Sequence, residues 1–234
     1  MSRQLPLELA LRSASRLEDY VAGDDGQVLD LLARQRSGEG EPQLYLVGAE
    51  GSGRSHLLLG QCAAAREAGL EAAYLPAAER AELAPEMLEG LERYDLLAVD
   101  DVDALAGEAD WELALFHLYN RARERGCRLL FAAAAPAATA GFRLPDLRTR
   151  LGWGLSYRLP PLDDARREEL LRRLAQRRGL ELPAEVARYL LARCPRDPRA
   201  LAALVERLDR DSLAEQRRLS IPFVRRRLAA DEGA

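Results

Sequence analysis

Residues Gly48 to Ser55, which read GAEGSGRS, have the spacing of a phosphate-binding loop. That loop follows the pattern GxxxxGK with Ser or Thr next, and here Arg54 occupies the lysine position. The apolar run Tyr45–Val47 comes just before the loop and predicts a buried strand, and a helix is expected to begin after Gly53. Strand, loop and helix in this order predict a nucleotide site. The alternative is a glycine-rich turn that binds nothing.

The loop residues are expected to form a phosphate cradle, to bind Mg²⁺ and to contact phosphate through Arg54. Ser55 supplies a hydroxyl for Mg²⁺, and Arg54 contacts phosphate as a planar fork instead of a compact point charge. Binding of a diphosphate should survive this change, whereas placement of a transferring γ-phosphate should weaken. The cradle consists of loop residues whose backbone curls until N–H groups point inward, next to a helix N-terminus, namely Gly48, Gly51, Ser52 and Gly53.

A second group of polar residues ends a later apolar run in the segment Tyr94 to Asp103, which reads YDLLAVDDVD. A buried strand that ends in two acids is the expected partner of a phosphate loop. Asp100 would hold Mg²⁺, directly or through water, and Asp101 would orient the attacking water. Aspartate is one carbon shorter than the glutamate usual at the second position, so its reach is reduced. Without the loop upstream, the same pair would be read as a turn or a helix cap.

Composition limits the class of protein. The chain has 234 residues, a formal net charge of −4, and arginine at all 34 basic positions, which indicates a coding bias. No global basic field draws the protein to DNA. Cys62, Cys127 and Cys194 are scattered without metal-ligand spacing and predict reduced, buried thiols. Neither a signal-peptide pattern nor a membrane-spanning run occurs, so we expect a cytoplasmic protein without a membrane partner.

The elements that position these residues alternate between strand and helix up to Pro160. Short apolar strands separated by helices predict an α/β domain with a parallel sheet covered on both faces. An alanine-rich stretch, Ala135–Gly141, is expected to be a loop. The predicted strands are 43–48, 71–75, 95–100, 127–133 and 154–159, and the predicted helices are 54–68, 85–92 and 111–125.

Only helical patterns follow Pro160 and Pro161, which predicts a small helical domain. Its four helices are expected to start at the cap Asp163 or Asp164, at Pro183, at about residue 198 and at Ser220. The first would end near Arg178, the third near 209 and the fourth near Leu228. The predicted organisation is therefore a tail at 1–16, an α/β nucleotide-binding domain at 17–160 and a helical domain at 161–234.

This architecture resembles the AAA+ family, an α/β nucleotide domain followed by a helical lid, and within it the DnaA branch. The string LEDYVAG at 17–23 is similar to the motif that lies beside the adenine in that branch, which implies that Tyr20 and Val21 pack near the base. The string GSGRSHLL at 51–58 is also similar, including His56, to which we assign no chemistry of its own.

The resemblance gives two arginines a role. Arg150, in LPDLRTRLGWG, matches the family's arginine finger, which inserts into the nucleotide site of a neighbouring subunit. Arg148, two residues away, competes for that role. Arg199, in RDPRALAAL, matches the second sensor arginine of the lid, which contacts the chain's own nucleotide. By spacing alone, each would be an ordinary surface residue of an arginine-rich chain.

Two departures from the family pattern are informative. The strand ending RLLFAAAA (128–135) carries alanines where a polar sensor residue is expected. Together with Arg54 and Asp101, it makes three changes at positions that handle a γ-phosphate, which predicts tight nucleotide binding with weak hydrolysis. In addition, the sequence stops at Ala234, which leaves no room for the DNA-reading domain that follows the lid in DnaA.

The N-terminal residues QLPLEL match the form of bacterial sliding-clamp-binding peptides. Gln4 offers amide hydrogen bonds, and Leu5, Leu7 and Leu9 offer apolar anchors for a pocket on a partner. The alternative is an edge strand, because alternating leucines are common there.

The resemblance implies a regulatory member of the DnaA branch. It would hold ADP (or ATP) with Mg²⁺, dock on the DNA polymerase III sliding clamp, and present Arg150 to ATP on DnaA, so that it contacts DNA only through the clamp. It would then activate another protein's ATPase instead of acting chiefly as an enzyme. Three alternatives stay open: an autonomous ATPase such as a helicase loader, an origin-binding initiator, and an adaptor that only contacts DnaA. The oligomeric state, including a homodimer, is open as well.

Overall fold

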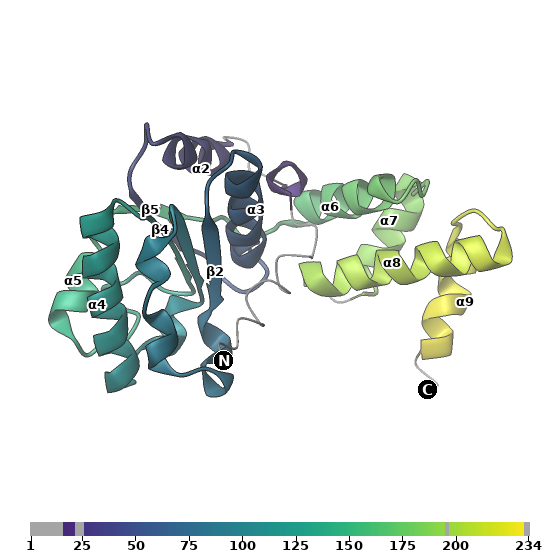
Figure 1. Ribbon diagram of the computed structural model, residues 1–234. Helices are drawn as coiled ribbons and strands as arrows, with labels where there is room; N and C mark the ends of the chain where they lie inside the picture. The colour runs from purple at the N-terminus through teal and green to yellow at the C-terminus, as the bar shows by residue number, and fades with distance from the viewer. Residues whose placement is uncertain (1–15, 22–25, 195–196, 232–234) are drawn as a thin grey trace, which may run out of the picture. The chain divides into compact units, whose positions relative to one another are not determined.

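A five-stranded parallel sheet forms the centre of the first part of the chain in the computed structural model, which describes residues 16–21, 26–194 and 197–231. The strand order is β2-β3-β4-β1-β5, and every neighbouring pair is parallel (Figure 1). All five predicted strands are confirmed to within one residue at each end. Their bounds are β1 Gln43–Val47, β2 Ala72–Pro76, β3 Leu96–Asp100, β4 Arg128–Ala133 and β5 Leu155–Arg158.

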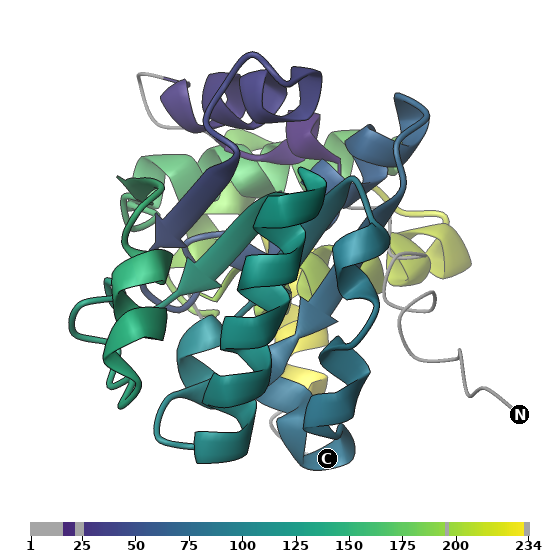
Figure 2. The ribbon, with the colours of Figure 1, turned by 60° about the vertical axis from the view of Figure 1, so that its left-hand side comes forward.

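Helices cover both faces of the sheet, so side chains of β1 alternate between two apolar cores. Tyr45 and Val47 join the core under α4 (Ala109–Arg125), whereas Leu44 and Leu46 join the core under α3 (Arg54–Glu67). Figure 2 looks onto the face that α4 covers. The strands read as continuous apolar runs because both faces are buried. Strand β5 differs, since it forms one edge of the sheet and is largely exposed.

The prediction of helices in this unit needs correction. The predicted helix 85–92 is wrong, because Gly90 adopts φ 82° and divides the segment into two short 3₁₀ turns, η3 (Pro85–Leu88) and η4 (Leu91–Arg93). Two helices escaped the sequence analysis, α2 (Gln27–Ser37) and α5 (Pro145–Leu151). The second of these carries the predicted arginine finger.

The chain divides into two compact units, Met1–Pro161 and Leu162–Ala234, and the described residues of the second form four helices. The cap on α6 is Asp163, whose carboxylate accepts a hydrogen bond from the Arg166 amide at 2.8 Å. The prediction that the third helix ends near 209 is wrong, because it continues to a left-handed residue, Gln216 (φ 52°). The bounds are α6 Asp164–Arg177, α7 Ala184–Leu191, α8 Pro198–Glu215 and α9 Ile221–Asp231.

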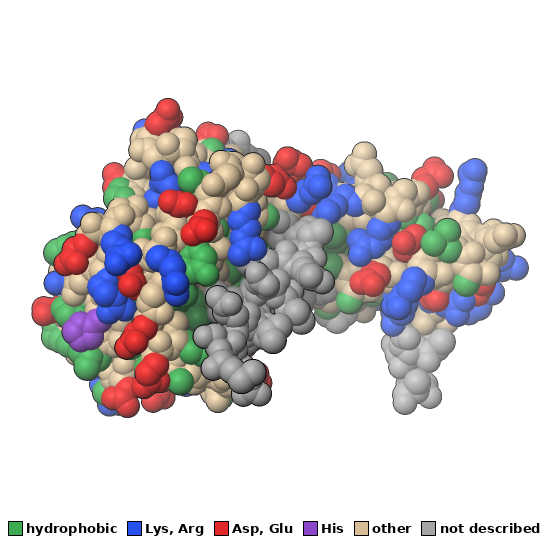
Figure 3. All heavy atoms as spheres, in the orientation of Figure 1, with side chains coloured by type: hydrophobic (Ala, Val, Ile, Leu, Met, Phe, Trp, Pro, Cys, Tyr) green, Lys and Arg blue, Asp and Glu red, His purple; other side chains and the backbone are tan. Residues whose placement is uncertain are grey.

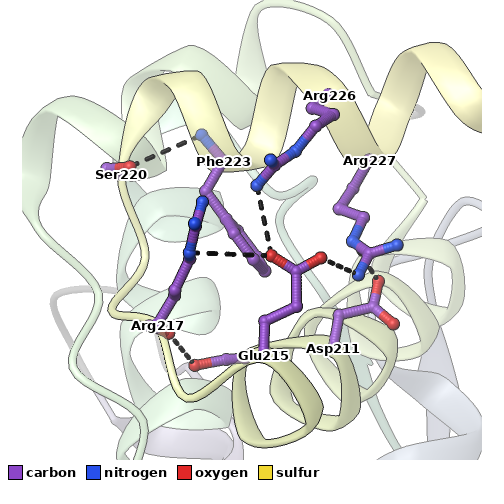
Figure 4. A network of polar contacts seen from close by, with 8 residues as sticks. Asp211, Glu215, Arg217, Ser220, Phe223, Arg226 and Arg227 are labelled. Atoms are coloured by element: carbon purple, nitrogen blue, oxygen red, sulfur yellow. Dashed lines mark hydrogen bonds and ion pairs between the residues drawn. The ribbon is translucent and has the colours of Figure 1, made fainter.

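A charged network fixes the corner between α8 and α9 (Figure 4). Glu215 accepts hydrogen bonds from Arg226, at 3.2 Å, and from Arg227. Arg227 also lies 3.3 Å from Asp211, one turn earlier on α8. Acids at the end of α8 therefore hold the middle of α9 through its arginines.

The surface carries charges of both signs. Figure 3 shows arginine and acidic side chains interspersed over the visible face, consistent with a net charge of −4. Within the described residues, no helix combines the length and apolar character needed to cross a membrane. Burial raises the pKa of the Cys62 and Cys127 thiols to about 12, so both stay protonated at neutral pH.

Candidate functional site

The phosphate loop leaves the sheet at the carboxyl end of β1. The Gly48 amide still donates to the carbonyl of Ala133 on β4 at 3.1 Å, so the loop begins as an extension of the sheet. Gly51 (φ 75°) and Gly53 (φ 92°) adopt left-handed backbone conformations, and α3 begins at Arg54. Glycine suits both positions because side chains disfavour this conformation. The first amides of α3 are therefore directed to the edge of the sheet where a phosphate would lie.

The loop encloses a tight, polar space. A Cβ atom at Gly48 would lie 2.3 Å from the hydroxyl oxygen of Ser52. Ser52 is only 3% exposed, and among the described residues its hydroxyl has no hydrogen-bond partner. An unsatisfied buried hydroxyl costs about 1–3 kcal/mol, so a bound phosphate oxygen would satisfy a group that the fold leaves open. The loop thus fits a phosphate group.

The arginine at the lysine position contacts the second acid after β3. A nitrogen of Arg54 (Nη2) lies 3.0 Å from an oxygen of Asp101 (Oδ1), with the two side chains 12% and 34% exposed. Asp101 adopts a left-handed conformation (φ 47°), which directs its carboxylate toward the loop. The residue predicted to touch phosphate and the residue predicted to orient water are therefore paired with each other.

Asp100, the predicted magnesium residue, is buried at the end of β3. It is 2% exposed, and its two oxygens accept hydrogen bonds from the Tyr74 hydroxyl at 2.7 Å and the Asp101 amide at 3.0 Å. Each oxygen keeps a lone pair for a water, which fits the water-mediated form of the prediction. The described residues contain no cluster of three or more metal-ligating side chains. Mg²⁺ would therefore rely on phosphate oxygens, water and Ser55, the second residue of α3.

The segment predicted to lie beside the base packs against the phosphate loop. The Tyr20 ring approaches Gly53 so closely that a Cβ atom there would lie 2.8 Å from it, and it stacks with His56 at a centroid distance of 6.4 Å. Val21 is buried as well. A ring nitrogen of His56 (Nε2) lies 2.9 Å from the Arg16 carbonyl. His56, for which the sequence indicates no chemistry, thus connects the N-terminal segment to α3.

Backbone hydrogen bonds hold the segment after β4, where a polar sensor side chain is expected. The amide of Ala134 donates to Asp103 at 2.9 Å, and the Tyr45 hydroxyl donates to the Ala135 carbonyl at 3.1 Å. Burial raises the pKa of Tyr45, with a smaller contribution from Asp103, so this hydroxyl remains a donor at neutral pH. The segment after β4 is therefore fixed to the acidic turn without a polar side chain of its own.

The predicted finger lies on α5 and stacks on its own subunit. The guanidinium carbon of Arg150 is 4.3 Å from the centroid of the Phe116 ring and 5.9 Å from that of Tyr119, both on α4. Arg150 is half-buried, whereas Arg148 is exposed. The two arginines that are alternatives for the finger therefore differ in surroundings, since Arg150 stacks on aromatic rings of α4 and Arg148 is exposed.

Gln43 places α5 at the amino end of β1. Its side-chain amide donates to the carbonyls of Arg150 and Leu151 at 3.0 and 2.9 Å, and it accepts from the Tyr119 hydroxyl at 2.6 Å. Gln43 is the first residue of β1, and the phosphate loop follows the last, Val47. At about 3.3 Å per residue, the strand separates the two by about 13 Å. Arg150 therefore lies at the amino-terminal end of the strands, whereas the phosphate loop of the same chain lies at their carboxyl end.

Two groups of predicted residues extend beyond what the structure describes. Arg199 is the second residue of α8, but its side chain lies outside the described part. The predicted clamp peptide lies wholly outside the described residues: Gln4, Leu5, Leu7 and Leu9.

A phosphate loop after β1, an acidic pair after β3 and the order β2-β3-β4-β1-β5 define an AAA+ nucleotide-binding fold, here followed by a helical lid. The chain belongs to the bacterial DnaA ATPase-domain family, whose model matches residues 12–158. The model of the Hda lid domain matches residues 163–228. A DnaA-type ATPase domain and an Hda-type lid therefore account for most of the chain.

Solved structures have the same fold. Domain III of the DnaA protein from Thermotoga maritima matches with a TM-score of 0.77 and 21% identity, covering 94% of this chain and 95% of that one. AMPPCP-bound DnaA from Aquifex aeolicus matches with a TM-score of 0.69 and 22% identity, covering 84% and 65%. A DNA replication initiation factor matches with a TM-score of 0.70 and 21% identity, covering 82% and 63%. The chain thus spans just under two thirds of the latter two proteins.

Proposed function

We propose that this protein is an Hda-type regulator of replication initiation. It binds ADP, associates with the sliding clamp, and inserts Arg150 into the nucleotide site of DnaA to stimulate hydrolysis of the ATP bound there. The result is a negative regulator that converts the initiator to its ADP form. The observation that carries the proposal is the position of Arg150 at the amino-terminal end of the strands, away from the phosphate loop of its own chain at their carboxyl end.

Nucleotide binding is supported by the loop itself. The buried hydroxyl of Ser52, which has no hydrogen-bond partner among the described residues, and the left-handed glycines at positions 51 and 53 fit a phosphate cradle. DnaA from Aquifex aeolicus, with the same fold, was solved with the nucleotide analogue AMPPCP bound. We assign ADP or ATP with Mg²⁺ to this site, with the base beside Tyr20 and Val21.

Weak hydrolysis by the protein itself is supported by the neighbours of Arg54. Its pairing with Asp101 occupies the two groups that would hold the γ-phosphate and the attacking water. The sensor position carries alanines, and the Ala134 amide is already bonded to Asp103. These groups fit retention of a diphosphate better than transfer of a phosphoryl group.

The stacking of Arg150 on its own subunit does not prevent action in trans. Leaving the ring of Phe116 costs about 0.5–1 kcal/mol, or about 2 kcal/mol where the pair is desolvated. An arginine finger accelerates phosphoryl transfer by about 10³–10⁵-fold, equivalent to about 4–7 kcal/mol. The gain in the partner's site exceeds the cost of release, so the rings serve as a resting position from which the guanidinium is extended.

The surface beside the finger supports a protein partner. Trp153 is 63% exposed and its amide donates to the Arg150 carbonyl at 3.1 Å. Leu155, 38% exposed, begins the edge strand β5. A large exposed aromatic side chain next to a charged one is typical of an interface hot spot. We assign this surface to contact with DnaA.

Clamp association rests on the sequence QLPLEL at residues 4–9. An extended peptide with alternate apolar anchors is a common way to dock on a partner. In this proposal, the clamp brings the regulator to DNA, and the protein contacts DNA only through it. A cytoplasmic location follows from these partners.

The test is an assay of ATP hydrolysis by DnaA with and without this protein and a DNA-loaded clamp. Stimulation that Arg150→Ala removes and Arg148→Ala retains would support the proposal. Stimulation that survives Arg150→Ala would refute the finger, and no stimulation by the unaltered protein would refute the function.

An autonomous ATPase, such as a helicase loader or a DnaA-like initiator, is the second candidate. The intact loop and the buried Asp100 favour it. Multiple turnover by the isolated protein, abolished by Asp101→Ala, would establish it. Sedimentation with and without ADP would show in addition whether a homodimer forms.

A further inference from the structure

A buried carboxylate on α4 joins the turn that precedes α4 to the segment that precedes the finger helix. Glu112 is 2% exposed. Its carboxylate accepts hydrogen bonds from the amide of Gly107 at 2.7 Å, from the amide of Arg143 at 2.9 and 3.0 Å, and from the amide of Leu144 at 2.7 Å. A single side chain therefore satisfies three backbone donors from two separate segments.

Each segment belongs to a different part of the site. Gly107 ends the turn that contains η5 (Val102–Leu105) and follows the acidic pair at the end of β3. Leu144 is the N-cap residue of α5 and offers no side chain to cap that helix. The carboxylate of Glu112 binds the amides of Arg143 and Leu144, the two residues just before the helix, so the entry to α5 is fixed to α4 and to the acidic turn.

The finger helix depends on such anchors. Helix α5 has seven residues, which is too short for it to be stable alone in water. Its C-terminal end is anchored by Gln43, which donates to the carbonyls of Arg150 and Leu151. Its N-terminal end is anchored by Glu112. The two anchors together fix the axis along which Arg150 projects.

Glu112 is charged at neutral pH despite its burial. Burial alone would raise the pKa of this carboxyl, but the amides of Arg143, Leu144 and Gly107, with the nearby charge of Arg143, lower it below its usual value. Hydrogen bonds to a charged acceptor are the strong ones. The anchor therefore holds through the ionised carboxylate.

We infer that Glu112 is the positioning residue of the arginine finger: it holds the start of α5 so that Arg150 enters the partner's nucleotide site in the productive orientation. Glu112 acts through Leu144 and α5, away from the reacting atoms. The inference rests on the proposed function, in which Arg150 acts in trans.

The test is Glu112→Gln in the full-length protein. Both carboxylate oxygens face backbone amides, so either orientation of the glutamine amide turns its NH₂ group toward an N–H donor. The maximal rate of DnaA ATP hydrolysis should fall by about 10- to 100-fold, the effect of small misplacement of a catalytic group. The concentration for half-maximal stimulation and the affinity for ADP should stay within about twofold, because the docking surface and phosphate loop are intact.

Glu92→Gln is the matched control. Glu92 is also a buried carboxylate packed on α4, 11% exposed and 3.3 Å from Arg121, and its pKa is likewise lowered. In the described structure, it contacts neither Gly107 nor the start of α5. Its neutralisation should leave the maximal rate within about twofold, since the finger keeps both anchors. An equal loss of rate in both variants would overturn the inference, because it would indicate a general effect of neutralising a buried acid.

Hydrogen exchange gives a readout that does not involve DnaA. Amides of residues 146–151 should exchange about tenfold faster or more in Glu112→Gln than in Glu92→Gln, because the charged anchor just before α5 is lost. Unchanged exchange in α5 would overturn the inference, even if Arg150→Ala abolished stimulation. Accelerated exchange alongside stimulation that survives Arg150→Ala would instead refute the finger function alone. If Glu112→Gln fails to fold, Glu112→Asp is the substitute, because it keeps the charge but shortens the reach of the side chain. It should show a smaller fall in the maximal rate and a smaller increase in amide exchange. A rate and an exchange equal to those of the wild type would also overturn the inference.

Discussion

Removing the charge of Asp101 should strengthen nucleotide binding, because this acid competes with phosphate for Arg54. The test substitution is Asp101→Asn. Asp101 lies in the left-handed region (φ 47°), which asparagine tolerates almost as well as glycine does, so the backbone should keep its course. Asparagine has nearly the same shape and no charge. The change therefore removes the ion pair and little else.

The magnitude follows from the exposure of the pair. Two charges 3.0 Å apart attract strongly, but Asp101 is 34% exposed, and solvent screening reduces the net contribution of such a pair to about 0.5–1 kcal/mol. A phosphate that binds Arg54 in the unaltered protein gives up that amount. Releasing the guanidinium should thus lower the Kd for ADP by about two- to fivefold. The gain should shrink as salt is raised, since partly exposed charges are screened.

Calorimetric titration of ADP into both proteins, at low and at high ionic strength, measures this effect. Asp103→Asn is a useful control, because that acid hydrogen-bonds to the Ala134 amide and does not pair with Arg54 in the structure. A Kd that rises by threefold or more in Asp101→Asn would refute the reasoning. It would mean that the carboxylate supports the nucleotide, through Mg²⁺ or water, more than it competes with it.

The remaining predictions concern the finger, its surroundings and the tail. Arg150→Ala should lower stimulation of DnaA by at least about 10³-fold while destabilising the fold by only about 1 kcal/mol in urea unfolding, because Gln43 holds α5 through backbone carbonyls that alanine retains. Trp153→Ala should raise the half-saturating concentration about tenfold at an unchanged maximal rate, whereas Leu213→Ala, which truncates another exposed apolar residue, should not; a lowered maximal rate would contradict a docking role. The folded-state pKa of Glu112 lies below its usual 4.5, so the contribution of this carboxylate to stability is complete above pH 4.5 and is lost as the pH falls through the lowered value. In urea unfolding, the stability advantage of wild type over Glu112→Gln should therefore shrink below pH 4.5. A constant difference in stability would contradict the assignment. Deletion of residues 2–10 should abolish clamp binding in a pull-down and leave ADP affinity intact, and clamp binding that persists would refute the peptide.

Local patterns were enough to predict the sheet, whereas contacts distant in sequence were not predictable. The strands are continuous apolar runs, and the loop and the acidic pair follow strands at fixed spacing, so each could be identified locally. The helix at 85–92 failed because Gly90 interrupts it with a positive φ. Helix α5 was missed because it is short, has no side-chain cap of its own and is anchored at its entry by Glu112 from another helix.

The candidate site shows the same division. The phosphate loop, Asp100 and Arg150 were predicted by motif. The pairing of Arg54 with Asp101 and the anchoring of α5 by Gln43 were not found, because these partners lie far apart in the chain, 107 residues in the case of Gln43 and Arg150. Such contacts exist only once the sheet has brought its edges together, and no local pattern encodes them.

The contact between Arg16 and His56 limits the distance between the clamp and the phosphate loop in the proposed clamp complex. The chain is fastened beside the phosphate loop at Arg16, and Leu9, the last anchor of the proposed peptide, precedes it by seven residues. Fully stretched, those residues span about 25 Å. A clamp that grips Leu9 would thus hold the nucleotide end of α3 within that radius, and every DnaA molecule reached by Arg150 would have to approach the same small neighbourhood of the DNA.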